Sequence, residues 1–85
     1  MMNYYLFIFH STHDAIASKQ YLEQKIPIMI MPTLREISSS CGISIRVKEE
    51  QFEEAKNLME KGRIRRYKVY AIHGKEVELI QSYEV

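Results

Sequence analysis

One cysteine stands among residues that could tune its chemistry. Cys41 is the only cysteine of the 85-residue chain, and in the stretch PTLREISSSCGISIRV it follows three serines and precedes Gly42. The thiolate is the reactive form of cysteine, and a nearby helix N-terminus, histidine or arginine lowers the thiol pKa from about 8.5. Gly42 has no side chain and would leave room for a second sulfur or a small anion. The stretch indicates a presented thiol, with a simply buried cysteine as the open alternative.

Two histidines and an arginine are the candidates for this tuning. His10 and His13 lie in FHSTHD, and Arg35 lies upstream of Cys41. The two histidines and Cys41 could also form a partial set of metal ligands, but histidines that cap a helix or form hydrogen bonds are the more common case. We therefore predict neither a metal ion nor a cofactor.

Hydrophobic periodicity predicts the elements that would position these side chains. Strands are expected over 4–9, 26–31, 42–47, 67–72 and 76–85, and helices over 13–25 and 49–61. Ser11 and Asp14 have the spacing of a capping box at the start of the first helix. Apolar residues at near-helical intervals indicate the first helix: they are Ala15, Ile16, Ala17, Tyr21 and Leu22. Gly62 follows the second helix, where glycine commonly ends a helix.

This order predicts an α+β fold: a ferredoxin-like two-layer sandwich, β-α-β-β-α-β, with an extra C-terminal strand. We expect one domain over 1–85. Since crossovers join parallel strands, the segment after the second strand should lie at the same sheet edge as FHSTHD, which would bring Cys41, His10 and His13 together. The first two strands are apolar on both faces, so the face without helices should be covered by the extra strand or by a second copy in a homodimer.

Composition narrows the classes of partner. The chain is 46% hydrophobic and 27% charged with a formal net charge of +1, which gives no electrostatic reason to expect nucleic acid or a membrane. A basic run could suggest a nucleic-acid surface, but we interpret it as a solvated connection; it comprises Lys61, Arg63, Arg65, Arg66 and Lys68. MMNYYLFIFH is typical of a strand rather than a signal peptide, and one unpaired cysteine fits a reducing compartment. We expect a cytoplasmic protein.

Three stretches, YYLFIFHSTHDAIASKQYL, IPIMIMPTLREISSSCGISIRV and EEQFEEA, resemble the putative selenium/sulfur carrier protein-like family of small bacterial proteins. The resemblance covers about 4–70, and the hairpin over about 67–85 extends past it. It implies a carrier rather than a self-sufficient enzyme: Cys41 would hold sulfur or selenium as a persulfide or selenosulfide and pass it from a donor to an acceptor protein. The matching motif positions around Cys41 are His10, Ser11, Thr12, His13, Arg35, Glu36, Ser40 and Gly42.

A second function stays open. Ser38, Ser39 and Ser40 offer hydroxyl and backbone donors to a small anion, so the stretch could serve a non-catalytic anion-binding module. In that case Cys41 would be incidental or a redox sensor, and the protein could be a regulatory homodimer.

Overall fold

The computed structural model of the protein describes residues 3–33, 42–64 and 66–83. Its elements are β1 (Asn3–Phe9), α1 (Thr12–Glu23), β2 (Met29–Pro32), β3 (Ile43–Lys48), a 3₁₀ turn (Glu49–Gln51), α2 (Phe52–Lys61), β4 (Tyr67–His73) and β5 (Glu76–Tyr83). Arg35, Glu36, Ser38, Ser39, Ser40, Cys41 and Arg65 lie outside the described residues.

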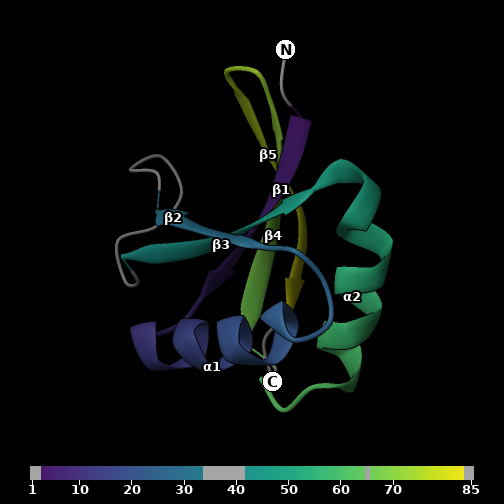
Figure 1. Ribbon diagram of the computed structural model, residues 1–85. Coiled ribbons are helices and arrows are strands. Elements are labelled where there is room, and N and C mark those ends of the chain that lie inside the picture. Colours follow the sequence, from purple (N-terminus) through teal and green to yellow (C-terminus); the bar gives the residue numbers. More distant parts are fainter. Residues whose placement is uncertain (1–2, 34–41, 65, 84–85) are drawn as a thin grey trace.

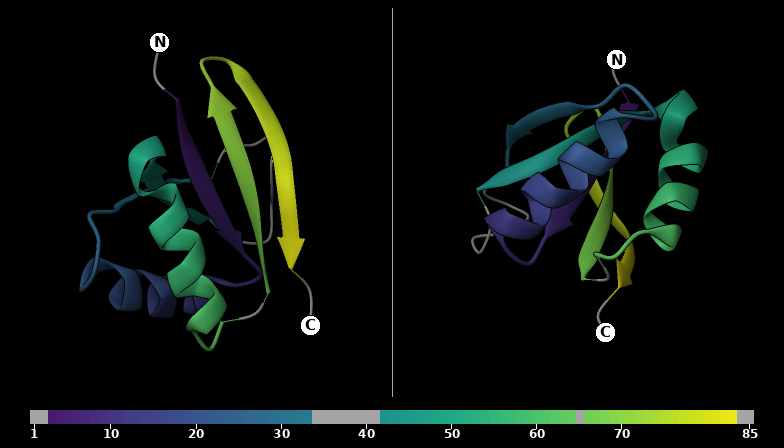
Figure 2. Two further views of the ribbon diagram at one scale, coloured as in Figure 1. Left: turned by 90° about the vertical axis from the view of Figure 1, so that its right-hand side faces the viewer. Right: turned by 60° about the horizontal axis from the view of Figure 1, so that its bottom comes forward.

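The strands form one sheet in the order β2-β3-β1-β4-β5, and every neighbouring pair is antiparallel. Figures 1 and 2 show both helices on one face of this sheet. The predicted α+β class is confirmed. The strand order differs from a plain four-stranded ferredoxin-like sheet, because β5 adds an outer strand beside β4.

The main core lies between the sheet and the helices. Alternate residues of β1 point into it, including Phe7 and Phe9, which are buried with Leu22 of α1 and Met59 of α2. The period of two in a strand places these aromatic rings on one face. Burying them removes large apolar surfaces from water, which is the main favourable contribution to folding.

A smaller cluster occupies the opposite face of the sheet. Leu6, Ile8 and Ile72 are buried there, and Val77 of β5 packs against them. The chain therefore buries part of this face by itself, and β5, which lies beside β4 in the same sheet, widens the face and contributes Val77 to the cluster. Arg46 adds a cation–π contact on the same side, with its guanidinium carbon 4.2 Å from the centre of the Tyr4 ring.

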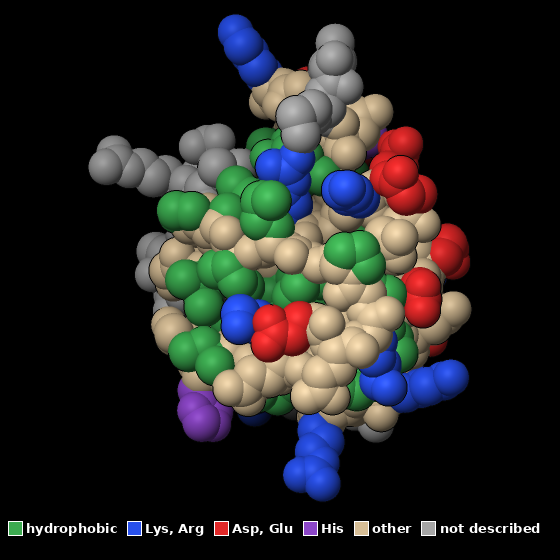
Figure 3. All heavy atoms as spheres, in the orientation of Figure 1, with side chains coloured by type: hydrophobic (Ala, Val, Ile, Leu, Met, Phe, Trp, Pro, Cys, Tyr) green, Lys and Arg blue, Asp and Glu red, His purple; other side chains and the backbone are tan. Residues whose placement is uncertain are grey.

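The first helix buries one face that includes a serine. Its fully buried side chains are Ala15, Ser18 and Leu22, whose spacing of three and four residues defines one face of a helix. Ile16 stands about 100° around the helix from Ala15 and is 44% exposed. Ile16 therefore lies outside the buried face, because the helical period sets which of the apolar positions face the core. Figure 3 shows hydrophobic side chains at the surface around α1 and β2.

Two strand ends have local causes. The second strand starts at Met29 rather than Ile26, because the Ile26 N–H donates to the Leu22 carbonyl at the end of α1 and Pro27 has no N–H.

The hairpin between β4 and β5 turns at Gly74, where φ is 62°. Glycine adopts this left-handed conformation without strain, and at the first central position it is typical of a type II′ turn.

Candidate functional site

Thr33 and Gly42 are the described residues on either side of 34–41. The Thr33 N–H donates to the Gly42 carbonyl oxygen at 3.1 Å, one residue beyond the last β2–β3 pair, Pro32 with Ile43. The backbone hydrogen bonds between β2 and β3 therefore continue up to Thr33 and Gly42, the two residues that flank 34–41.

A second bond supports the same end of the ladder. Thr33 Oγ1 lies 2.8 Å from Ser44 Oγ, and the Ser44 side chain is completely buried. Sequence reasoning missed this pair, since alternation in ISIRV indicates a solvent-facing serine. A buried hydroxyl needs a partner, and Thr33 supplies it across the two strands.

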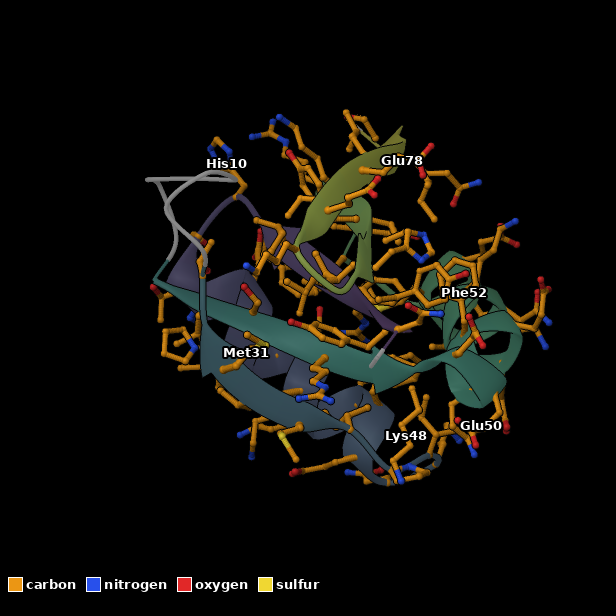
Figure 4. All side chains as sticks on the ribbon, turned by 90° about the horizontal axis from the view of Figure 1, so that it is seen from above. His10, Met31, Lys48, Glu50, Phe52 and Glu78 are labelled. Carbon is orange, nitrogen blue, oxygen red and sulfur yellow. The ribbon has the colours of Figure 1, made fainter. Side chains whose placement is uncertain are left out.

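The register of β1 against β3 brings His10 and Gly42 to the same end of the sheet, where β1 ends and β3 begins; this end is called the His10–Gly42 edge. Ile8 pairs with Ser44, and His10 follows Ile8 by two residues while Gly42 precedes Ser44 by two. In Figure 4, His10 and Met31 lie toward the start of β3, whereas Glu50 and Phe52 lie toward the far end of that strand. His10 and Gly42 therefore lie at the same end of the sheet, and the prediction that Cys41 lies there too falls outside the described residues.

The residues at the start of α1 differ in their availability. Ser11 is the N-cap, and its Oγ accepts a hydrogen bond from the Asp14 N–H at 3.2 Å, as the capping-box spacing predicts. His10, Thr12 and His13 are exposed. Ser11 therefore caps α1, whereas the side chains of His10, Thr12 and His13 face solvent at the same end of the sheet.

Gly42 is exposed and has open space beside it. Among the described residues, no atom lies within 4 Å of a Cβ built on Gly42. Neither a positive φ nor a contact with the described residues requires a glycine at this position.

No metal-binding cluster of three His, Cys, Asp or Glu side chains occurs among the described residues, a set that does not include Cys41. Within the same set, no helix has the length and apolar character needed to cross a bilayer.

The sequence comparison decides the family. Residues 4–71 match the family described as "Putative Se/S carrier protein-like". The chain belongs to this family. No curated protein and no solved structure matches the chain. The match to the Se/S carrier family spans β1 through most of β4 and therefore includes both sides of the His10–Gly42 edge, while β5 lies beyond it.

Proposed function

We propose that this protein carries sulfur or selenium on Cys41 and transfers it between a donor protein and an acceptor protein. Membership of the Se/S carrier family is the observation that carries the proposal. Cys41 is the only sulfur nucleophile that the chain offers for a persulfide, since its other sulfur atoms belong to methionine thioethers.

The loading step is a displacement between sulfur atoms. The Cys41 thiolate attacks the outer, sulfane sulfur of a donor persulfide, a new S–S bond forms on Cys41, and the donor's S–S bond breaks to release the donor thiolate. An acceptor nucleophile then attacks the outer sulfur and restores the Cys41 thiolate. Each step exchanges one bond to sulfur for another, so no external oxidant is needed, and a reducing cytoplasm keeps the resting thiol free.

The described flanks of the cysteine support this chemistry. Cys41 is bonded to Gly42, and the β1–β3 register brings Gly42 to the edge where His10 and the N-terminus of α1 lie. A helix N-terminus and an imidazolium each favour a thiolate over a thiol. The space at Gly42 would admit the outer sulfur of a partner.

In the same proposal the remaining motif positions assist Cys41. Arg35 would add positive charge, Ser40 a hydrogen-bond donor, and Glu36, Thr12 and His13 polar contacts to the donor or acceptor.

Intact-protein mass spectrometry tests the loading step. The purified protein is incubated with inorganic polysulfide and weighed, and we expect the addition of one sulfur atom that is absent in Cys41→Ser. Dithiothreitol should remove the added sulfur and release sulfide. An unchanged mass for the folded wild-type protein, or the same addition to Cys41→Ser, would contradict the proposal.

A further inference from the structure

A pocket of about 350 Å³ lies between α1 and the chain that leaves α2. Apolar groups form most of its wall: Ala17 and the Tyr21 ring from α1, Met59 from α2 and Ile64 beyond α2. The Tyr21 hydroxyl donates to the Leu58 carbonyl oxygen at 2.9 Å, which holds the ring in place. This volume is at the lower end of the range for small-molecule pockets, and it fits a ligand of roughly ten non-hydrogen atoms.

Two cations line the same pocket. Lys61 and Arg63 are exposed, and neither forms an ion pair within the described ranges 3–33, 42–64 and 66–83. The C-terminus of α2 contributes a partial negative charge of about half an elementary charge, which two full positive charges outweigh. The pocket therefore combines an apolar wall with a net positive rim.

An unsatisfied hydroxyl also lies in the wall. Ser18 is only 1% exposed, and its Oγ has no hydrogen-bond partner among the described residues. Buried hydroxyls nearly always have a partner. A serine hydroxyl turns about a single χ1 bond, so a bound molecule with an acceptor oxygen could satisfy it.

From these three features we infer a binding site for a small molecule that has an apolar body and one carboxylate. The apolar body contacts Tyr21, Met59 and Ile64. The carboxylate lies toward Lys61 and Arg63, and one of its oxygens accepts the hydrogen bond that Ser18 can donate. In this inference two residues of the basic run, Lys61 and Arg63, serve to bind the carboxylate. It lies apart from the His10–Gly42 edge and does not depend on the carrier function.

Three probes separate the contributions of body and charge. The ¹⁵N-labelled protein is titrated with octanoate, with octanol, which keeps the body, and with acetate, which keeps the charge. We expect the amide signals of Ser18, Gly62 and Ile64 to shift and saturate with octanoate, with a Kd on the order of 1 mM. Octanol and acetate should bind roughly tenfold more weakly or not at all. Saturation by octanol at the same concentration as octanoate would overturn the anion site.

Matched variants locate the site. Ala17→Leu, which fills the pocket with a good helix former, should abolish the octanoate shifts. Arg63→Ala should raise the Kd about two- to fivefold, whereas Lys68→Ala, an exposed cation of β4, should leave it unchanged. Cys41→Ser should also bind octanoate normally. Unaltered binding by both Ala17→Leu and Arg63→Ala, or shifts confined to the His10–Gly42 edge, would refute the inference.

Discussion

Thr33 Oγ1 and Ser44 Oγ lie 2.8 Å apart, and this contact joins the end of β2 to the start of β3. Ser44 is completely buried, so its hydroxyl depends on Thr33. The same threonine bonds through its backbone to Gly42. One residue thus fixes both the ladder and a buried hydroxyl next to the candidate site.

Thr33→Val should lower the free energy of unfolding by about 1–3 kcal/mol, because it leaves the buried Ser44 hydroxyl without a partner. Adding Ser44→Ala to this variant should restore most of the loss, since both polar groups are then gone. Urea denaturation of the wild type and the two variants measures the differences in unfolding free energy. Equal stability of Thr33→Val and the wild type would show that the contact contributes nothing.

Tyr5 and Phe52 stack with ring centres 3.9 Å apart and an angle of 15° between the planes. In a double-mutant cycle with Tyr5→Leu and Phe52→Leu, we expect a coupling of about 0.5–1.5 kcal/mol in unfolding free energy. A cycle that pairs Phe52→Leu with Phe9→Leu, four residues from Tyr5 along β1, serves as control and should give a coupling near zero. Indistinguishable couplings in the two cycles would refute a specific stack.

Gly62→Ala should destabilise the protein more than Gly42→Ala. A Cβ at Gly62 would meet Tyr21 Cε2 at 3.3 Å, and that ring is anchored by its hydrogen bond to Leu58. A Cβ at Gly42 meets no atom of residues 3–33, 42–64 and 66–83 within 4 Å, so that variant should stay within about 0.5 kcal/mol of the wild type. Thermal unfolding tests this ranking of Tm values. In a Tyr21→Phe background the ring loses its hydrogen bond to Leu58 and can move, so the difference in Tm between Gly62→Ala and Gly42→Ala should become smaller. The reverse ranking would contradict the steric argument.

Alkylation of Cys41 by iodoacetamide should reach its half-maximal rate below about pH 8.5, the value for an ordinary cysteine. Positive charge and donated hydrogen bonds favour the thiolate, so His10→Ala should move this midpoint upward. His73→Ala provides the control, since His73 pairs with Asn3 at the opposite end of β1. A midpoint at or above 8.5, with a thiol that resists alkylation until the protein unfolds, would count against the carrier function.

The order of strands and helices was predictable because periodicity reports which face of an element is buried. The cap at Ser11 and the turn at Gly74 were also predictable, since each rests on local backbone chemistry. The burial of Ser18 and Ser44 was not predictable. It depends on which neighbouring element covers each position, and this tertiary context is not encoded in a short window of sequence.

The candidate site was predictable in part for the same reason. Strand directions bring His10 and Gly42 to one edge, and these directions follow from the order of elements. The contribution of Thr33 depends on the β2–β3 register, which a four-residue strand does not reveal by its pattern. The cation-rimmed pocket was missed because it forms between α1 and the chain after α2, far apart in sequence.

The short length of β2 has a consequence for solubility. As an outer strand it could template pairing with another molecule and start aggregation. It has only four residues and ends at Pro32, which has no N–H to offer to an incoming strand. Short-lived contacts of another protein with β2 can therefore form without starting irreversible self-association of the sheet.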